Sequence, residues 1–558
     1  MYKSGFSICA ILIFLFILSA ALQAQYSGGS GEPNNPYKIS TVADWQTLMK
    51  TPSHWDKHFI LTANLDLQGI MLSPVGNNPK AFTGVFDGNG HIIRNVVLQQ
   101  PDSQCVGLFG YVDQNGQICK IGLENVEITG SDLVGGLVGF CNSGNLDNCY
   151  AVGSVSGSWC VGGLVGDNSG SLTSCYATGS VSGDRNVGGL VGDNFFGNLN
   201  DCYAASFVTG EKCAGGLVGG NMVGNLTACY ATGLVIGVGA VGGLVGWNVN
   251  GTVNNCCSTI TASGEYDIGG LVGSNRGGIL TFCYAKGSIE GTGFGVGCLV
   301  GMNDKGSITA CYATGSVNGR SSVGGLVGLN KAGSVNERPN VVDLVGLDKE
   351  GSISACYAIC IVSGEDSVGG LVGKNRSKAS LIDCYAAGSV SGNIYVGGLL
   401  GSNDDSVVTA CYSTGSINGE NYIGGLVGGD YNGSIIACFW DIETSGWATS
   451  AGGVGRTTAE MKTRSTFTNA GWDFVGETEN GTEDIWSVCE GTNYPRLTWQ
   501  IPSSDWLCPD GVGMEDFSYL AQFWMIPEAG NTTADLDKNN AVGISDLLLF
   551  CEQWLRGK

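Results

Sequence analysis

The segment Val323-Gly-Gly-Leu-Val-Gly-Leu-Asn330 decides the fold, because its pattern recurs along most of the chain. It follows Gly306–Gly319, where short runs of β-branched residues alternate with glycine and asparagine. Such runs are typical of short strands joined by tight turns. We count twelve full units, from Val106–Gly110 to Ile423–Gly428, and one shorter unit between Gly333 and Gly346.

One cysteine in each unit defines the period. Neighbouring cysteines are 26 to 28 residues apart, except for one gap of 45 that equals a full unit plus the shorter one. A repeat of about 27 residues with three short strands is typical of one coil of a β-solenoid. The cysteine ladder comprises Cys149, Cys175, Cys202, Cys229, Cys256, Cys283, Cys311, Cys356, Cys384, Cys411 and Cys438.

The repeats therefore predict an all-β fold. We expect a right-handed parallel β-helix, or solenoid, of about 13 coils with capping segments, followed by a small α-helical module. A β-propeller is the alternative, but its blades need about 40–50 residues and four strands. Residues 106–440 show no 3.6-residue period that would indicate helices instead.

The composition excludes several classes of protein. Of 558 residues, 93 are glycine and 11 proline, without the Gly-X-Y period of collagen. The hydrophobic fraction of 43% and the charged fraction of 13% do not suit a disordered chain. A net charge of −23 repels phosphate backbones, so we expect no nucleic-acid partner.

The N-terminus indicates export. Lys3 precedes the apolar run Phe6–Leu18, and small residues allow cleavage after Ala24. A membrane anchor is the alternative, but the run is shorter than the roughly 20 residues that a span needs. We expect a secreted, extracellular protein, associated with the cell surface, that has no membrane span after signal removal.

The chain accordingly divides into five parts. Residues 1–24 are expected to be a signal peptide, 25–105 an N-terminal cap with the first coils, and 106–440 the repeat solenoid. Residues 441–504 are expected to form a C-terminal cap, and 505–558 a small calcium-binding module. Caps are expected because a solenoid exposes open strand edges at both ends.

The repeat motif resembles that of the GLUG-repeat proteins, which are bacterial surface and secreted proteins. The matching residues include Gly163–Gly166, Gly189–Gly192 and Gly425–Gly428. The resemblance covers roughly residues 30–500, flanks included, and implies a surface or adhesion role. It implies no activity, since a fold alone carries none.

Equivalent residues of successive coils form ladders. The cysteines are expected to be buried thiols, because in-register side chains keep their Cβ atoms too far apart for disulfides. Asparagines are expected to accept left-handed turn angles and to hydrogen-bond the next coil. This asparagine ladder comprises Asn168, Asn194, Asn221, Asn248, Asn275, Asn303, Asn330, Asn375 and Asn403. Off-ladder cysteines, such as Cys489, Cys508 and Cys551, cannot be paired from the sequence.

A tyrosine follows most ladder cysteines and should point outward, because neighbouring residues of a strand face opposite ways. Such a stripe can face a ligand, such as flat sugar rings or a partner protein. Alternatively, the rings pack on one another and serve the sheet alone. The tyrosine stripe comprises Tyr150, Tyr176, Tyr203, Tyr230, Tyr284, Tyr312, Tyr357, Tyr385 and Tyr412.

No catalytic constellation emerges, so we expect no enzyme activity. His54 and His58 lack a third zinc ligand, and the chain has no His-Glu-x-x-His motif. Asp167 and Asp193 occupy one turn position of successive coils, at the separation of a retaining glycosidase pair. Other residue types hold that position elsewhere, which favours an unconstrained solvent position instead.

The C-terminus contains a twelve-residue calcium loop, Asp535–Asp546. Side-chain oxygen donors fall at positions 1, 3, 5 and 12, and a carbonyl is available at position 7. An apolar helix is expected to follow, and an ordinary acidic helical tail is the alternative. The expected calcium ligands are Asp535, Asp537, Asn539, Ala541 and Asp546.

A degenerate copy of this unit begins at Asp505, with Leu507 and Pro509 at ligand positions. Two such loop–helix units resemble dockerin domains, which attach secreted proteins to cohesin receptors. The resemblance implies a cohesin-like partner, although Ile544-Ser545 departs from the usual Ser-Thr recognition pair.

Together these features predict an exported, non-catalytic β-solenoid that serves in adhesion or as a scaffold and binds polysaccharide or another surface ligand. The alternative is a β-helical polysaccharide-degrading lyase or glycoside hydrolase carrying the same module.

Overall fold

A computed structural model of the chain describes residues 26–114, 116–332, 351–505, 508, 512–524, 533–539 and 541–556. The chain divides into two compact units, residues 1–264 with 270–274, and residues 265–269 with 275–558. The expected signal peptide, residues 1–24, and most of the shorter repeat unit, residues 333–350, lie outside the described residues.

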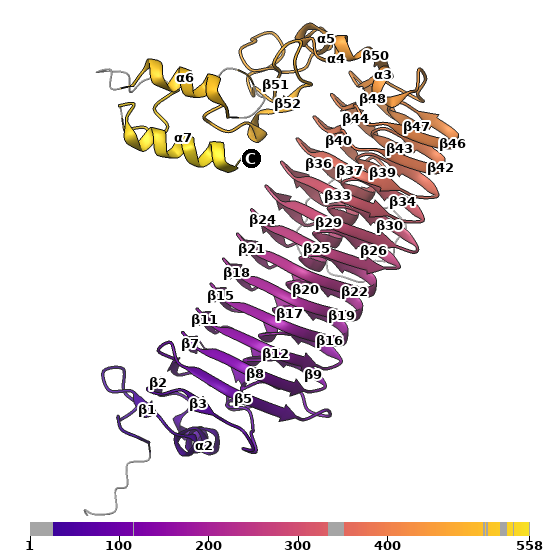
Figure 1. Cartoon of the computed structure of the whole chain (residues 1–558). Helices are drawn as coiled ribbons and strands as arrows, with labels where there is room; N and C mark the ends of the chain where they lie inside the picture. The colour runs from indigo at the N-terminus through magenta and orange to yellow at the C-terminus, as the bar shows by residue number, and fades with distance from the viewer. Residues whose placement is uncertain are drawn as a thin grey trace, which may run out of the picture. The chain divides into compact units, whose positions relative to one another are not determined.

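Both units are parallel β-solenoids, as predicted (Figure 1). Each full coil contributes a short strand, a strand that begins at the tyrosine position, and a strand that ends near the ladder asparagine. We call the resulting sheets the short-strand sheet, the tyrosine sheet and the asparagine sheet. Twelve strands of the described residues belong to the asparagine sheet, one for each full repeat unit.

In unit 1 these strands have the following bounds. The short-strand sheet contains β1 (Tyr37–Ile39), β2 (His58–Leu61), β4 (Val85–Asp87), β7 (Gln117–Cys119), β11 (Asn145–Asp147), β15 (Ser171–Thr173), β18 (Asn198–Asn200), β21 (Asn225–Thr227) and β24 (Thr252–Asn254). The tyrosine sheet contains β3 (Leu65–Asp66), β5 (Ile92–Gln99), β8 (Gly122–Thr129), β9 (Asp132–Gly135), β12 (Tyr150–Ser156), β13 (Trp159–Gly162), β16 (Tyr176–Gly188), β19 (Tyr203–Gly215), β22 (Tyr230–Gly242) and β25 (Cys257–Gly264). The asparagine sheet contains β6 (Phe109–Val112), β10 (Val138–Cys141), β14 (Val165–Asn168), β17 (Val191–Phe195), β20 (Val218–Met222) and β23 (Val245–Val249), and β27 (Val272–Arg276) falls at the division between the units.

Unit 2 repeats the arrangement. Its short strands are β28 (Ile279–Thr281), β32 (Ser307–Thr309), β36 (Ser352–Ser354), β40 (Ser380–Ile382), β44 (Val407–Thr409) and β48 (Ser434–Ile436). Its tyrosine-sheet strands are β26 (Tyr266–Gly269), β29 (Tyr284–Gly291), β30 (Phe294–Gly297), β33 (Tyr312–Asn318), β34 (Ser321–Gly324), β37 (Tyr357–Ser363), β38 (Asp366–Gly369), β41 (Tyr385–Ala386), β42 (Val390–Gly397), β45 (Tyr412–Ser413), β46 (Ile417–Gly424), β49 (Phe439–Asp441) and β50 (Val454–Arg456). Its asparagine-sheet strands are β31 (Val300–Asp304), β35 (Val327–Lys331), β39 (Val372–Arg376), β43 (Leu400–Asp404) and β47 (Val427–Tyr431).

The coils on either side of the shorter repeat unit are direct neighbours in unit 2. Val327 pairs with Val372, and Ile308 pairs with Ile353. The ladder therefore runs without a gap across a 45-residue step in the sequence.

The glycines of the motif are required at the corner between the tyrosine and asparagine sheets. A Cβ atom on Gly162 would lie 2.0 Å from the Val165 carbonyl oxygen, and one on Gly163 would lie 2.2 Å from that of Gly189 in the next coil. The Leu164 and Val165 side chains that follow are fully buried. The motif therefore combines a corner that only glycine fits with two core side chains.

The ladder cysteines point into the core and are free thiols, as predicted. Each sulfur lies near main-chain carbonyls; the Cys175 thiol, for example, donates to Thr173 O over 3.3 Å. Burial raises the pKa of the Cys311 and Cys411 thiols well above the ordinary value. These cysteines act as small core residues with a weak internal hydrogen bond.

The ladder asparagines are buried and bond from coil to coil, as predicted. Asn168 Nδ2 donates to Asn194 Oδ1 over 2.8 Å, and Asn194 does the same to Asn221. The expected left-handed backbone is wrong for these residues, since the positive φ angles occur two positions later, at Phe196 and Val223. The strand extends through the asparagine and turns only after it.

An N-terminal helix caps unit 1. Helix α2 (Val42–Lys50) is followed by the 3-10 turn η1 (Pro52–His54). Trp45 of α2 is fully buried and packs edge-on against Phe86 and Phe109, with ring centroids 5.7 and 6.1 Å apart. Helix α2 thus packs an aromatic side chain against the first coils.

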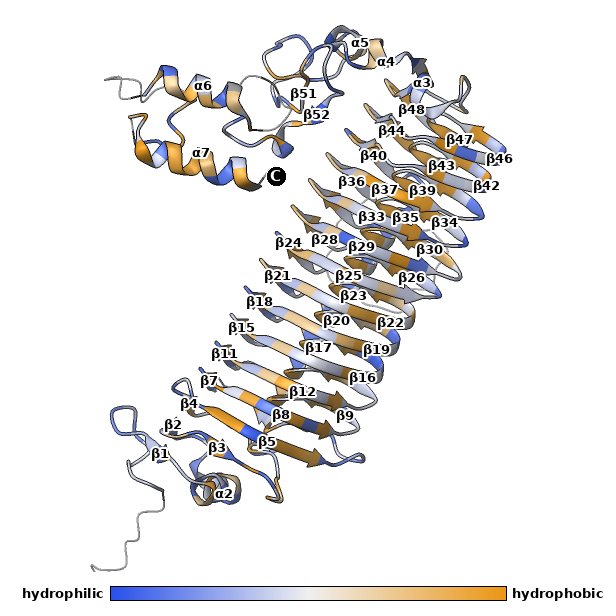
Figure 2. Cartoon of the chain, viewed as in Figure 1, coloured by the Kyte–Doolittle hydropathy of each residue, from blue (hydrophilic) through white to orange (hydrophobic). Residues whose placement is uncertain are grey.

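Unit 2 continues into short elements and two helices. These are α3 (Ile442–Ser445), α4 (Thr458–Met461), α5 (Arg464–Thr468), β51 (Trp486–Ser487), β52 (Arg496–Leu497), η2 (Thr498–Gln500), α6 (Met514–Gln522) and α7 (Ile544–Arg556). Hydrophobic and hydrophilic residues mix along α7 (Figure 2), and its Phe550 packs with Leu520 of α6 in a small core. None of the described helices is long and apolar enough to cross a membrane.

Candidate calcium site and tyrosine stripe

Three carboxylates of the predicted calcium loop converge ahead of and within the first turn of α7. One oxygen from each of Asp535, Asp537 and Asp546 lies within 4.8 Å of the others, and these residues form the one group with such geometry among those described. Asp535 and Asp546 are buried, whereas Asp537 is exposed. Like charges this close repel each other, so the arrangement suits a divalent cation bound by oxygen atoms.

The loop backbone holds these carboxylates in place. Asn539 N donates to Asp535 Oδ1 and to Asp537 Oδ1, over 3.1 Å in each case. Asp546 Oδ1 accepts from Leu536 N over 2.6 Å and from Asp537 N over 3.1 Å. The chain therefore wraps around the carboxylates and points main-chain N–H groups at them.

The other two predicted ligands, Asn539 and Ala541, are not part of the group of three converging carboxylates. Asn539 Nδ2 donates to Asp537 Oδ2 over 2.6 Å, and Asn539 Oδ1 accepts from Ala541 N over 2.9 Å. The Asn539 amide is thus engaged within the loop. Hydrogen bonds, first from Ser545, lower the pKa of Asp537.

The two helices of the module begin in the same way. Gly543 N donates to Asp546 Oδ2 over 2.8 Å, and Gly513 N donates to Asp516 Oδ2 over 3.0 Å. In both cases an aspartate in the first turn of the helix accepts a hydrogen bond from a glycine N–H three residues earlier. Leu507 and Pro509 of the degenerate copy lie outside the described residues, whereas Asp505 is buried.

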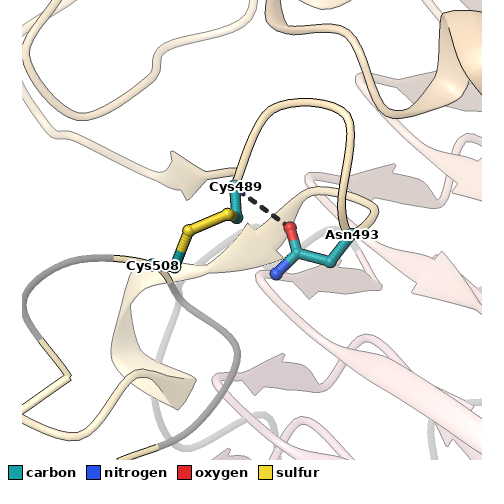
Figure 3. Close-up of a disulfide and its surroundings, with 3 residues drawn as sticks. All are labelled: Cys489, Asn493 and Cys508. Carbon is teal, nitrogen blue, oxygen red and sulfur yellow. Dashed lines mark hydrogen bonds between the residues drawn. A yellow bond between two sulfur atoms is a disulfide. The ribbon is translucent and has the colours of Figure 1, made fainter. Parts of the chain in front are cut away.

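A disulfide joins two of the cysteines that the sequence could not pair. Cys489, between β51 and β52, is bonded to Cys508, with the Cα atoms 5.0 Å apart (Figure 3). Cys489 N also donates to Asn493 Oδ1 over 2.8 Å. The bridge links the C-terminal cap to the start of the helical module, while Cys551 is free.

The tyrosines of unit 1 stack on one another. The ring centroids of Tyr150 and Tyr176 are 4.7 Å apart with planes 7° from parallel, and the pairs up to Tyr230 are similar. Tyr230 is 42% exposed. Because each ring covers the face of its neighbour, edges and hydroxyls are the parts of the stack most open to solvent.

The stripe of unit 2 is also stacked, but the chain covers its last members. The Tyr357, Tyr385 and Tyr412 rings lie 5.1 and 5.0 Å apart. Tyr385 and Tyr412 are buried, so these two cannot face an external ligand, contrary to expectation. Their partners belong to the C-terminal cap, in particular Trp486, whose ring lies 6.4 and 5.9 Å from theirs.

The cap is anchored by indole hydrogen bonds that sequence reasoning missed. Trp499 Nε1 donates to Ala355 O over 2.9 Å, and Trp472 Nε1 donates to Ala437 O over 2.8 Å. Both acceptors lie just before a ladder cysteine. No local signal at this position locates the cap, since Ala228 of unit 1 also precedes a ladder cysteine and Asp383 of unit 2 does so beneath the cap.

Asp167 and Asp193 pair in register on β14 and β17, as predicted. They do not occupy a freely solvated position, contrary to our interpretation, because one oxygen of each is buried without a hydrogen-bond partner. Burial raises the pKa of Asp167 to about 6. Burial, followed by the charge of Asp167, raises the pKa of Asp193 to about 7, against a hydrogen bond from Asn186 Nδ2.

The two histidines of the rejected zinc motif do not share a helix. His54 ends η1 and stacks on Tyr37 with centroids 5.2 Å apart, whereas His58 begins β2. His54 also hydrogen-bonds the Tyr26 hydroxyl at 3.2 Å. His54 therefore has a packing role in the N-terminal cap.

Comparisons with known proteins identify the repeat. The family model described as "The GLUG motif" matches residues 157–182, 364–391 and 392–418. Halomucin of Haloquadratum walsbyi is 35% identical over 158 residues, which is 26% of this chain but 2% of halomucin. A protein of Evansella cellulosilytica described as a Gly-rich membrane protein is 33% identical over 152 residues, which is 25% of this chain and 18% of that protein.

One solved structure is also similar. It is described as an immunoglobulin A1 protease from Bacteroides ovatus, and it matches with 20% identity and a TM-score of 0.33 over 48% of this chain and 80% of that one. The matched regions thus cover small parts of the two sequence relatives. The chain carries GLUG-motif repeats, and these build a parallel β-solenoid.

Proposed function

We propose that this chain is an exported, non-catalytic surface or adhesion protein, in which a β-solenoid is attached through a calcium-dependent, dockerin-like C-terminal module. The observation that carries the proposal is the convergence of Asp535, Asp537 and Asp546. Two sequence relatives whose names denote a mucin and a membrane protein support a place at the cell surface. A cohesin-like receptor and a polysaccharide are the partners that this arrangement suits.

Calcium would be held by these three carboxylates, with the Ala541 carbonyl and the Asn539 side chain as further oxygen donors. Without the ion, three neighbouring negative charges destabilise the loop, so binding should stabilise the module. The module has a small core around Leu520 and Phe550. Metal binding should therefore contribute visibly to its folding.

The test is calcium titration of the full mature chain by isothermal calorimetry, together with thermal unfolding followed by circular dichroism. We expect uptake of calcium at micromolar to millimolar concentration and a rise in the unfolding temperature of a helical transition that a chelator reverses. Asp535→Ala should abolish the response. Asp505→Ala, in the degenerate copy, is the matched control and should leave it nearly unchanged. Absence of calcium uptake at millimolar concentration would refute the attachment mechanism.

A polysaccharide-degrading enzyme is the second candidate, and the Asp167–Asp193 pair is the observation that favours it. A retaining glycosidase needs one carboxyl held as acid and the other ionised as nucleophile. Here burial raises both pKa values, to about 6 and about 7, so the environment does not separate the two roles. Release of reducing ends from a polysaccharide panel, lost in Asp193→Asn, would establish the enzyme and overturn the non-catalytic proposal.

A further inference from the structure

A groove runs along unit 2 where the tyrosine sheet turns toward the glycine-rich corner. It has a volume of about 650 Å³ and crosses several successive coils. A Cβ atom on Gly364 would lie 2.8 Å from Val323 Cγ2, so the packed valines below require glycine here. The floor of the groove is this glycine ladder, Gly291, Gly319, Gly364, Gly392 and Gly419.

The walls of the groove carry polar side chains. Asn318 and Asn393 supply amides, and Ser363 Oγ donates to Asn318 Oδ1 over 3.0 Å. Arg320 and Glu365 form an exposed ion pair, with Nε and Oε2 3.4 Å apart. The groove therefore offers donors and acceptors on a shallow surface.

A second groove of about 460 Å³ adjoins the first and shares Thr292, Arg320 and Glu365 with it. It is lined by an aromatic pair, Tyr266 and Phe294, whose ring centroids are 5.0 Å apart and whose planes are 47° from parallel. The two residues are 38% and 46% exposed. Because the rings are tilted and not stacked, part of their faces is available to a ligand.

The equivalent aromatic residue of unit 1 is already covered. Trp159 occupies the same strand position as Phe294, and the Arg185 guanidinium lies over its ring, 5.7 Å from the centroid. Among the described residues no such cation lies over Tyr266 or Phe294. A groove of about 510 Å³ follows the glycines of unit 1 as well, but two of its lining side chains, Ile236 and Val238, are apolar. Unit 2 therefore combines open aromatic faces with a polar groove.

We infer that this groove and its aromatic pair bind a neutral polysaccharide chain. Sugar rings present hydroxyls to amides and charged groups, and their C–H faces pack on aromatic rings. The coil spacing of about 4.8 Å is close to the length of one pyranose unit, so each coil can meet one sugar. Acidic residues outnumber basic ones along the lining, Glu265, Glu365, Asp366 and Glu420 against Arg320, which disfavours uronate polymers.

This inference rests on the surface role proposed above but not on its calcium site. The test is affinity electrophoresis of the full mature chain in native gels that contain hydroxyethylcellulose, xyloglucan, glucomannan or, as the acidic counterpart, polygalacturonate. We expect at least one neutral polymer to retard the protein and polygalacturonate not to. Tyr266→Ala with Phe294→Ala should weaken retardation about tenfold or more.

Phe282→Ala is the matched control, because Phe282 is a 55% exposed aromatic residue of unit 2 outside the groove. Retardation should be unchanged in that variant. The inference is overturned if no neutral polymer retards the protein, if polygalacturonate retards it equally, or if the control loses as much as the double variant. Calorimetry on the same samples separates the two proposals. If the chain takes up calcium but no neutral polymer retards it, the polysaccharide-binding groove is refuted and the calcium-dependent attachment is not.

Discussion

Asp193→Asn tests the electrostatics of the buried carboxyl pair in unit 1. Asp167 and Asp193 stack in register, and each has one buried oxygen without a hydrogen-bond partner. Asn186 Nδ2 donates a hydrogen bond to Asp193 Oδ2 over 3.1 Å. The positive charge of Arg185 lowers the pKa of Asp193 less than the other causes change it, and the Arg185 guanidinium lies over the Trp159 ring. The pair therefore favours a protonated carboxyl over two negative charges.

The size of the pH-dependent loss of folding stability follows from the raised pKa values. Asp193 has a folded pKa of about 7, against an ordinary value of 3.8. Between these pH values the folded state holds a proton that the unfolded state has lost. The contribution of Asp193 to folding stability is therefore fully present below pH 4 and decreases as the pH rises toward 7. From pH 5 to pH 7 the loss of folding stability from this one group is about 2 kcal/mol. Asp167, with a pKa of about 6, adds a smaller loss of about 1 kcal/mol.

Asparagine at position 193 keeps the shape, cannot ionise, and can donate its amide to the Asp167 carboxylate. The stability advantage of Asp193→Asn over the wild type should therefore be larger at pH 8 than at pH 5, by about 2–3 kcal/mol. Urea unfolding followed by circular dichroism at both pH values measures the difference. Hydrogen exchange of residues 160–194, corrected for the intrinsic pH dependence, shows whether the effect is local.

Asp201→Asn is the control, because it removes an exposed carboxylate of the same unit. It should not alter the pH dependence. If wild type and Asp193→Asn lose the same stability between pH 5 and pH 8, the reasoning about burial is refuted.

Two further predictions concern the ladder thiols and the cap. The eleven ladder cysteines should resist iodoacetamide in the native protein and react once it is denatured. The reason is that they are buried and that burial raises the pKa of a thiol, as at Cys411. Alkylation of ladder cysteines in the native protein, counted by mass spectrometry, would contradict this prediction. Trp486→Ala should cost about 3–5 kcal/mol and expose Tyr385 and Tyr412, since it removes a buried ring from their contact. Faster hydrogen exchange in strands β45 and β49 is the readout, and unchanged exchange there would show that the cap does not hold the stripe.

The repeat pattern is sufficient to predict the solenoid, because each coil has the same local sequence and packs on a neighbour of the same kind. A period near 27 residues places one glycine corner, one core cysteine and one asparagine at the same point of every coil. Asn168 and Asn194 then bond to each other simply because they are equivalent. The carboxylates at Asp535, Asp537 and Asp546 were predictable for a similar reason, since a single short loop brings them together.

Tertiary structure decided the features that join residues distant in the sequence or depend on burial. Trp499 reaches Ala355 across 144 residues, and no local pattern in either segment specifies that contact. Cys489 and Cys508 were paired only when the cap placed them together. The carboxyl pair at Asp167 was found from the period, but its raised pKa depends on how deeply the neighbouring strands bury it. Periodicity specifies which residues are neighbours along a ladder, whereas solvation and long-range contacts depend on the whole packed unit.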